Sequence, residues 1–407
     1  MARSGRVIFL FFAALFLSPL AEARQTVLLV SIDGFRADYL DRGLTPTLSA
    51  LAAGGVRASM RPSFPSLTFP NHYTLVTGLY PDHHGIVDNT MDDKHLARSH
   101  FTLSDHEAVT DPAWWNEGVP LWVTLQRQGG HAATLFWPGS EAEIQGIRPD
   151  HWLTYDQRMS DADRVGRLLT WLDAPVAERP AFLTLYFDEV DTAGHHDGPD
   201  SEGVDRALAA VDGAITQLIE GLKQRGMAET IDLIIVADHG MAALAPERTV
   251  YIDDYIAPAS AHIVTWGAMM GMDPPIGVRS VIERALLSPK AHMACRRKQD
   301  MPERFHYGAN PRVPAILCLA ESGWTITTRA DAAKAHDHPY RGSHGFDNQL
   351  PEMAALFIAR GPDFRQGLVH APFDNVDVYP LMAKLLGMTP EANDGKLSDV
   401  ADMLITR

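Results

Sequence analysis

The chain has 407 residues, 46% of them hydrophobic, which is enough for one large domain or two of ordinary size. Its formal net charge is −16. A nucleic-acid groove needs a basic face, so this charge argues against one, although a pocket can still bind an anion where metal ions supply positive charge.

The N-terminal residues have the pattern of a secretory signal. Arg3 and Arg6 precede an apolar run over residues 7–17, and the sequence AEA at residues 21–23 offers a small-x-small cleavage site. The run is shorter than the ~18 residues of a typical membrane-spanning helix, so a retained anchor is the less favoured alternative. We predict a signal peptide at residues 1–23 and an exported mature protein, periplasmic or secreted, without a membrane span.

The mature chain alternates apolar runs with helical patterns, which is typical of a layered α/β fold. A first helix is predicted from Pro46, with Thr45 as its cap and the glycines at 54–55 as its stop. A long amphipathic helix has apolar positions from residue 204 to residue 222. The buried-strand runs are TVLLVSI at 26–32, FLTLYF at 182–187, IDLIIVA at 231–237 and AALFIA at 354–359.

Residues from about 245 to 340 lose this alternation, and we expect them to form a cap inserted into a catalytic domain that spans residues 24–407. This region contains both cysteines of the chain, Cys295 and Cys318. An even pair in an exported protein favours a disulfide, with two buried free thiols as the alternative. We expect the cap to line the substrate pocket, although its sequence offers no readable specificity pattern.

Six aspartate and histidine side chains lie where the predicted strands end or where a strand begins nearby: Asp33, Asp191, His195, Asp238, His239 and His344. Ligands gather outside the carboxyl ends of parallel strands, so these distant positions can converge. Each residue alone is commonly structural, for example as a helix cap. Together, three carboxylates and three imidazoles suffice for two zinc ions with open coordination positions, and manganese or iron is less well suited.

A candidate nucleophile lies in the sequence PSLTFPNH at residues 65–72. A two-metal site suits an in-line displacement, for which phosphoryl transfer is the usual reaction. The hydroxyl of Thr68 is too weakly acidic to attack unaided, but coordination to zinc would activate it. The alternative is that Thr68 caps the following helix, and both roles can coexist because a helix N-terminus also presents N–H groups to a phosphate.

These residues lie in sequence blocks that resemble those of the nucleotide pyrophosphatase/phosphodiesterase family of the alkaline phosphatase superfamily. The resemblance covers residues 26–390 and implies an α/β fold with an alkaline-phosphatase-like central sheet flanked by helices. The blocks, in family order, are VSIDGFR at 30–36, TFPNH at 68–72, HHGIVDN at 83–89, WPGS at 137–140, DTAGH at 191–195, DHGM at 238–241 and HGFDN at 344–348.

The resemblance also implies a role for each ligand of the two metal ions. One zinc ion, on the leaving-group side, would be bound by Asp191, His195 and His344. The other would be bound by Asp33, Asp238, His239 and the nucleophile Thr68, which becomes a phosphorylated intermediate before hydrolysis. His196, His336 and His338 lie near these blocks, and we interpret them as neighbours of the site and not as ligands.

Besides the metal ligands and the nucleophile, the resemblance implies contacts to the substrate from Asn89, Phe69, Tyr186 and the backbone of Thr68. Asn89 and the backbone N–H of Thr68 would hold a nonbridging oxygen of the phosphoryl group, as an oxyanion hole does. Phe69 and Tyr186 would sandwich a nucleobase, for which aromatic faces suffice. The alternative for Tyr186 is a core position on its strand.

The function predicted from the sequence is hydrolysis of phosphodiester or phosphoanhydride bonds in nucleotides by a two-zinc enzyme. The motif at Thr68 lacks the Cys or Ser nucleophile and the Arg of sulfatases, and the neutral Asn89 suits a diester better than a dianionic monoester. Choline phosphodiesters and phosphonates are alternative substrates for the same metal frame. A metal-containing binding protein without turnover is the alternative from another class. The sequence does not indicate an oligomeric state.

Overall fold

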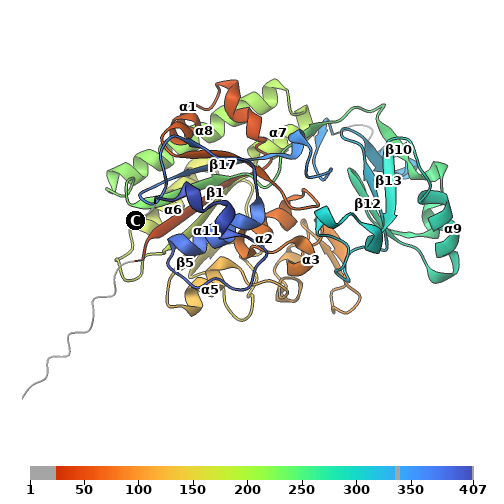
Figure 1. Cartoon of the computed structure of the whole chain (residues 1–407), viewed down its shortest axis with the longest axis horizontal. Helices are drawn as coiled ribbons and strands as arrows, with labels where there is room; N and C mark the ends of the chain where they lie inside the picture. Colours follow the sequence, from red (N-terminus) through yellow and green to blue (C-terminus); the bar gives the residue numbers. More distant parts are fainter. Residues whose placement is uncertain (1–23, 335–339, 406–407) are drawn as a thin grey trace, which may run out of the picture.

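The computed structural model describes residues 24–334 and 340–405, and its centre is a nine-stranded mixed sheet (Figure 1). The predicted signal peptide lies outside the described residues. In spatial order the strands are β18 (Leu368–Val369), β2 (Val56–Arg61), β17 (Ala355–Arg360), β8 (Ile231–Val236), β1 (Thr26–Ile32), β7 (Phe182–Phe187), β5 (Ala132–Leu135) and β6 (His151–Leu153), with β19 (Phe373–Asp374) also paired to β2.

The direction of the strands decides which loops meet. Strands β1, β5, β6, β7 and β8 run parallel, whereas β17 is antiparallel to both β8 and β2. The carboxyl ends of β1, β7 and β8 therefore share an edge with the beginning of β17. Every residue of β7 and β8 is buried, as expected for strands covered by helices on both faces.

Helices cover both faces of the sheet, which confirms the predicted α/β class. In the view of Figure 1, α1, α7 and α8 lie above the sheet, and α2, α5 and α11 lie below it. The helices are α1 (Pro46–Ala53), α2 (Thr68–Thr77), α3 (Pro81–His84), α4 (His106–Val109), α5 (Leu121–Arg127), α6 (Asp161–Leu172), α7 (Glu189–Asp197), α8 (Glu202–Gln224), α9 (Ile276–Leu286), α10 (Arg329–Lys334) and α11 (Val378–Leu385).

The cap of α1 differs from the one predicted. Thr45 occupies the N-cap position, but its side chain makes no capping hydrogen bond. The carboxylate of Asp212 on α8 accepts hydrogen bonds from the backbone N–H groups of Thr47 at 3.0 Å and Leu48 at 2.8 Å instead. A side chain from a neighbouring helix therefore satisfies the free amides at the start of α1.

The strands β9 (Ala242–Ala243) and β16 (Gly342–Ser343) pair with each other outside the main sheet, and this pairing brings together the two ends of the region between them. Within it lies a separate lobe, on the right in Figure 1, with its own apolar core. Its strands are β11 (His262–Thr265), β12 (Met269–Asp273), β14 (Ile316–Ala320) and β13 (Met293–Arg297), in that antiparallel order, with β10 (Thr249–Tyr251) and β15 (Thr325–Thr327) as a parallel pair.

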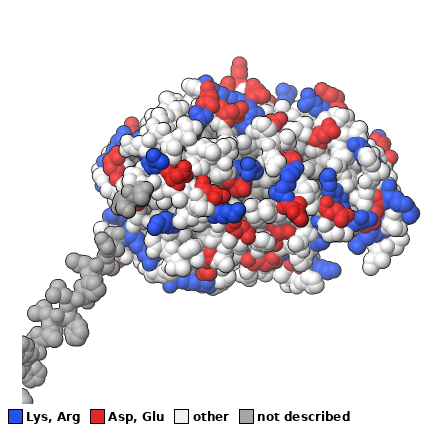
Figure 2. All heavy atoms as spheres, in the orientation of Figure 1, with Lys and Arg blue, Asp and Glu red and all other residues white. Residues whose placement is uncertain are grey.

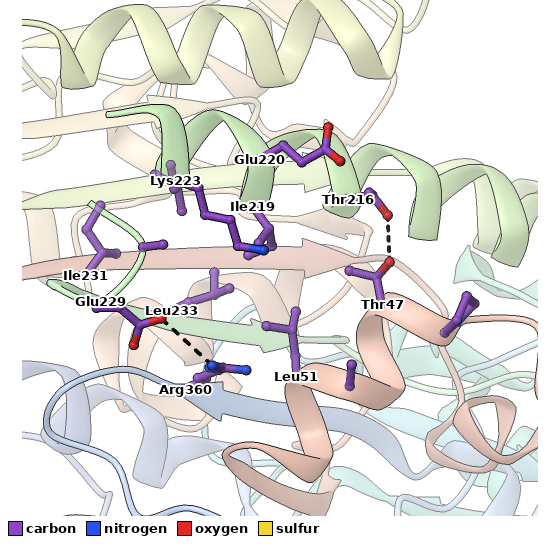
Figure 3. Close-up of a pocket in the computed structure, with 14 residues that line it drawn as sticks. Thr47, Leu51, Thr216, Ile219, Glu220, Lys223, Glu229, Ile231, Leu233 and Arg360 are labelled. Atoms are coloured by element: carbon purple, nitrogen blue, oxygen red, sulfur yellow. Dashed lines mark hydrogen bonds and ion pairs between the residues drawn. The ribbon is translucent and has the colours of Figure 1, made fainter. Parts of the chain in front are cut away.

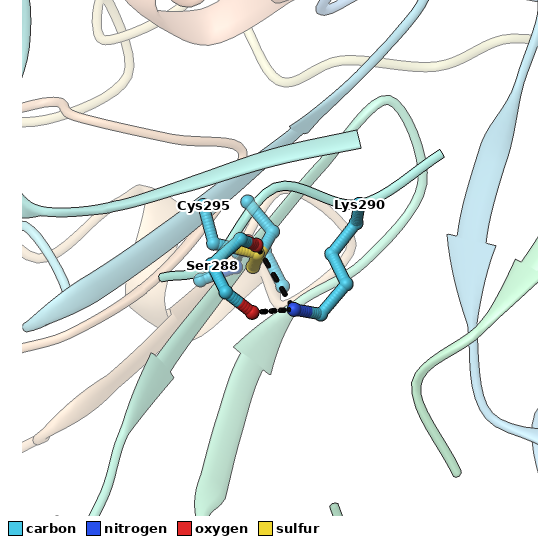
Figure 4. The surroundings of a disulfide bond; sticks show 6 residues. Ser288, Lys290 and Cys295 are labelled. Atoms are coloured by element: carbon cyan, nitrogen blue, oxygen red, sulfur yellow. Dashed lines mark hydrogen bonds between the residues drawn. A yellow bond between two sulfur atoms is a disulfide. The ribbon is translucent and has the colours of Figure 1, made fainter. Parts of the chain in front are cut away.

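The predicted disulfide is confirmed: Cys295 on β13 is bonded to Cys318, the residue directly opposite it on β14. Cys318 is fully buried, and nearby on the surface the ammonium group of Lys290 donates to the carbonyl and hydroxyl oxygens of Ser288 (Figure 4). The covalent bond joins the two strands of the cap sheet that follow α9. No helix in the described part of the chain combines the length and the apolar character needed to cross a membrane.

Candidate functional site

The structure brings all six predicted metal ligands together at the edge where β1, β7 and β8 end. Asp33 follows β1, Asp238 and His239 follow β8, and Asp191 and His195 lie one helical turn apart on α7. The ring of His344 reaches them from the segment between β16 and β17. The donor atoms of Asp191, His195 and His344 lie within 4.8 Å of one another, as do those of Asp33, Asp191 and His239.

The three histidines of this cluster share one hydrogen-bond arrangement. The Nδ1 atoms of His195, His239 and His344 each lie 2.9 Å from a backbone carbonyl oxygen, of Gly342, Gly240 and Ser66 respectively. A carbonyl oxygen only accepts, so each Nδ1 carries a proton, and in the neutral ring each Nε2 keeps its lone pair. The Nε2 atoms of His195 and His344 lie 3.1 Å apart, with two lone pairs facing one region. Histidines that bind metal ions are oriented in this way.

The carboxylates of the cluster have oxygens without hydrogen-bond partners among the described residues. These buried atoms are Oδ1 of Asp33, Oδ1 of Asp191 and Oδ2 of Asp238. Each of them faces an imidazole Nε2, at 2.9 Å from Asp238 to His239, 3.5 Å from Asp33 to His239 and 3.6 Å from Asp191 to His344. Carboxylates and neutral imidazoles grouped in this way present lone pairs to one region, which a cation would satisfy. Together with the imidazole lone pairs, these oxygens fit the borderline ligand set that zinc prefers. The residues present therefore fit divalent metal ions.

Burial and mutual charge shape the titration of the cluster. Burial and the neighbouring carboxylates of Asp238 and Asp191 raise the pKa of Asp33 well above its ordinary value. Although burial opposes ionisation, His239 and His72 lower the pKa of Asp238. Burial and the rings of His239 and His195 hold the pKa of His344 well below its ordinary value, so this imidazole is neutral, as a ligand must be.

Thr68 stands beside this cluster at the start of α2. Leu67 is the N-cap residue, so Thr68 is the first residue of the helix and its side chain does not cap it. Its hydroxyl Oγ1 lies 3.3 Å from Nε2 of His239. Thr68 and Phe69 are both partly exposed, which leaves the hydroxyl and the first amides of the helix open to a ligand.

Asn89 is held against the same helix N-terminus. Its side-chain Oδ1 accepts a hydrogen bond of 2.9 Å from the backbone N–H of Phe69. This contact fixes which side of the amide faces α2. The Nδ2 group makes no hydrogen bond to the residues that the structure describes, so it is free to donate to an anion beside Thr68.

Tyr186 makes a contact that the sequence did not predict. Its ring is only 8% exposed, and its hydroxyl donates a 2.6 Å hydrogen bond to Oδ2 of Asp33. The ring packs edge-on against His72 at 5.3 Å between centroids, so little of its face is open for stacking. Stacking of a base on Tyr186 stays a prediction, and the observed contact orients Asp33.

Sequence reasoning missed two residues at this site. Tyr155 is 43% exposed, and its ring lies 6.3 Å from the ring of Tyr186. His72 is buried near Asp238, but its Nδ1 binds the carbonyl of Thr68 at 2.9 Å and its Nε2 the hydroxyl of Ser31 at 2.8 Å. The motif position of His72 was a usable signal, whereas Tyr155 lies outside every motif.

The other histidines near the site differ in their placement. His196 is exposed on the last turn of α7, and its ring lies 6.0 Å from that of Tyr340. His336 and His338 lie outside the described residues. His72, which was not among the six predicted ligands, has a donor atom within 4.8 Å of those of Asp33 and Asp238, although both of its ring nitrogens already have hydrogen-bond partners.

A cavity and a charged surface lie away from the cluster. A cavity of about 380 Å³ lies between α1 and α8, with Leu51 and Ile219 on its wall and Lys223 and Arg360 reaching into it (Figure 3). None of the six candidate ligands lines this cavity. On the face seen in Figure 2, basic and acidic side chains are mixed.

Comparison with known proteins identifies relatives along most of the chain. Residues 27–347 match the family described as type I phosphodiesterase / nucleotide pyrophosphatase. Ectonucleotide pyrophosphatase/phosphodiesterase family member 3 of Bos taurus is 39% identical over 385 residues, which are 91% of this chain and 43% of that protein. Bis(5'-adenosyl)-triphosphatase of Bos taurus is 37% identical over 385 residues, covering 93% of this chain and 82% of that protein.

A solved structure is similar over nearly the whole chain. Murine ectonucleotide pyrophosphatase/phosphodiesterase 5, in an inactive form with a threonine-to-alanine substitution and in complex with AMP, superimposes with a TM-score of 0.88 at 34% identity. The match covers 94% of this chain and 100% of that one. This chain spans less than half the length of family member 3, at 43%. The chain belongs to the type I phosphodiesterase / nucleotide pyrophosphatase family.

Proposed function

We propose that this family member hydrolyses phosphodiester or phosphoanhydride bonds in nucleotides through a phosphorylated Thr68 intermediate, with two zinc ions as cofactors. One observation carries the proposal: three imidazole lone pairs and three unpartnered carboxylate oxygens converge beside the hydroxyl of Thr68. The names of the relatives, which include pyrophosphatases, phosphodiesterases and a bis(5'-adenosyl)-triphosphatase, support the nucleotide substrate class.

The six side chains would hold the metal ions in two sets of three. Asp191, His195 and His344 form one set, and Asp33, Asp238 and His239 form the other, with the Thr68 hydroxyl as a further ligand. Two zinc ions would supply Lewis acidity, and their combined charge would exceed that of the three carboxylates by one. A singly charged phosphodiester suits a site with this net charge.

The residues of the chain then divide the reaction into two displacements. Oγ1 of Thr68 attacks phosphorus and its proton passes to solvent, while the bond from phosphorus to the leaving oxygen breaks and that oxygen departs with the electron pair or takes up a proton from water. Nδ2 of Asn89 and the N–H of Thr68 donate to a nonbridging oxygen whose charge grows in the transition state. Water then attacks the phosphorus atom bound to Oγ1 and the bond to Oγ1 breaks. Oγ1 takes up one proton of that water, and the phosphate ester leaves with the hydroxyl of the water on phosphorus.

The exposed aromatic rings would bind the nucleobase. Phe69 and Tyr155 are partly open to solvent, and aromatic faces bind bases of any sequence by stacking. Tyr186 has its hydroxyl on Asp33 and would contribute by orienting that ligand. The nucleotide specificity of the site would therefore come from Phe69 together with Tyr155 more than from Tyr186.

We also propose that the protein is exported. The disulfide between Cys295 and Cys318 is of a kind that persists in oxidising compartments, and the N-terminal sequence has the pattern of a signal peptide.

A hydrolysis panel on the full chain tests the proposed activity. It compares the p-nitrophenyl ester of thymidine 5′-monophosphate, ATP, a p-nitrophenyl phosphocholine ester, phosphonoacetate and a simple monoester. We expect the highest kcat/KM for the two nucleotide substrates, because only they offer a base to the aromatic rings. Faster turnover of the choline ester or of phosphonoacetate would reassign the substrate on the same metal frame, and no turnover of any compound by zinc-loaded protein would support a binding protein.

A further inference from the structure

A short segment of the cap contacts the chain on both sides of Asn89. This clamp segment, residues 307–312, lies between the cap strands β13 and β14 and has no helix or strand of its own. Three of its side chains are almost fully buried, with exposures of 6% for Tyr307, 4% for Asn310 and 5% for Arg312. Their polar groups bind the catalytic domain, so the clamp segment is a built contact and not a loose surface loop.

Arg312 bridges the two flanks of Asn89. Its Nη1 donates to the carbonyl oxygen of Gly85 at 2.7 Å, before Asn89 in the sequence, and its Nε donates to the Asp93 carboxylate at 3.0 Å, after it. Nη1 also donates to the carbonyl oxygen of Trp114 at 2.8 Å. A guanidinium offers several donors in one rigid plane, so these groups are held in a fixed relative position.

Tyr307 and Asn310 hold two further points of the same stretch. The hydroxyl of Tyr307 donates to the carbonyl oxygen of Val87 at 2.9 Å. The Asn310 side chain donates to the carbonyl oxygen of Asp82 at 3.0 Å, and the backbone N–H of Asn310 donates to the Asp82 carboxylate at 3.2 Å. Together with the contacts of Arg312, the clamp segment therefore contacts four residues on the two sides of Asn89: Asp82, Gly85 and Val87 before it and Asp93 after it.

The stretch that carries Asn89 needs this support. Residues 85–89 lie between α3 and β3 (Thr90–Asp92) and belong to no helix or strand. The carbonyl oxygen of Asn89 accepts from the N–H of Leu103, and its side chain meets Phe69, which leaves the preceding residues to be held by other parts of the fold. An oxyanion donor has to stay within about 0.5 Å of its productive position.

We infer that the cap positions Asn89 for the reaction, with Tyr307, Asn310 and Arg312 as positioning residues that act through it. The inference rests on the proposed function, in which Nδ2 of Asn89 donates to the phosphoryl oxygen. The cap is then part of the phosphate-binding machinery in addition to any contact with the rest of the substrate.

A double-mutant cycle tests this inference. Tyr307→Phe removes only the hydroxyl that binds Val87, and we expect it to lower kcat for a nucleotide diester by about 3- to 10-fold, with little change in KM. In the Asn89→Ala background the same substitution should have no further effect, because the donor that it positions is gone. Arg312→Lys, which keeps the charge but loses the rigid fork, should show the same dependence on Asn89.

A matched control separates positioning from stability. Tyr379 is a buried residue of α11 whose hydroxyl accepts a hydrogen bond from the backbone N–H of Glu391. Tyr379→Phe removes this hydroxyl and should lower the melting temperature without changing kcat. Equal losses from Tyr307→Phe in both backgrounds, or no loss in the wild-type background, would overturn the positioning role alone. A silent Asn89→Ala would overturn the role of Asn89 in the proposed function as well, so the two failures are distinguishable.

Discussion

The edge of the main sheet and the cap contrast in how their residues are arranged. At the sheet edge, the candidate ligands follow strand ends or lie on α7, and the rigid parallel strands bring them together. The cap has its own antiparallel sheet, its own apolar core and a disulfide, and its residues 307–312 contact the segment around Asn89. The candidate ligands are thus placed by the main sheet, whereas the cap reaches the site through a loop.

Removal of the metal ions should have the largest effect on turnover, and it should leave the structure of the cap unchanged. We expect exhaustive chelation to abolish turnover and added zinc to restore it, because six donor side chains, three carboxylates and three imidazoles, converge at the sheet edge. The measurements are elemental analysis and hydrolysis of a nucleotide ester. Far-ultraviolet circular dichroism should show that the cap and the main sheet stay folded. Full activity in protein shown to be free of metal would contradict a two-metal mechanism.

Substitution of the nucleophile should have the next largest effect. We expect Thr68→Ala to lower kcat by roughly 10³-fold or more while both metal ions stay bound, since the six Asp and His ligands do not need the hydroxyl. Thr68→Ser should retain part of the activity because it keeps an attacking oxygen. An alanine variant with wild-type turnover would show that water attacks phosphorus directly.

Loss of the amide donor should come third. We expect Asn89→Ala to lower kcat/KM for diesters by on the order of 10²-fold, as for other single oxyanion donors. This substitution lies at the junction of the two regions, because α2 and the clamp segment both hold the Asn89 stretch. A rate within a factor of about two of wild type would make Asn89 a structural residue only.

The aromatic rings should distinguish nucleotide substrates from small ones. We expect Tyr155→Ala to lower kcat/KM for a nucleotide ester by about 5- to 150-fold, which corresponds to ~1–3 kcal/mol of stacking. Methyl p-nitrophenyl phosphate, which has no base, should be spared. Tyr186→Phe keeps the ring and loses the bond to Asp33, so it should affect both substrates alike. A selective loss from Tyr186→Phe, with Tyr155→Ala silent, would reverse the two assignments.

Removal of the disulfide should affect activity least. Cys295 and Cys318 are separated by 23 residues, and closing a loop of this length stabilises a fold by about 3 kcal/mol in the chain-entropy model. We expect the double substitution Cys295→Ser with Cys318→Ser to lower the free energy of unfolding by that order, with kcat changed less than about twofold. Denaturant unfolding and the nucleotide assay measure both. A large loss of kcat in fully folded protein would show that the cap sheet itself controls the chemistry.

The sequence alone indicated the family, the α/β class and the disulfide, and the comparisons and the structure confirm these. It also indicated the six candidate ligands and Thr68, and the structure brings them together. The α/β class can be read from the sequence because apolar runs mark the buried strands, and the six candidate positions meet because residues that follow the ends of parallel strands share one edge. Because β17 is antiparallel to β8, its first residue lies at that same edge, and His344 is in the segment that leads into β17.

Only the tertiary structure decided how side chains from distant segments meet. Asp212 caps α1 in place of Thr45, and the Tyr186 hydroxyl binds Asp33, because helix packing and strand register set these distances. The clamp by Arg312 joins residues more than two hundred positions apart, through a loop that has no sequence pattern of its own. Periodicity records which face of an element is buried, but the partner that a buried polar group finds depends on the packing of the whole chain.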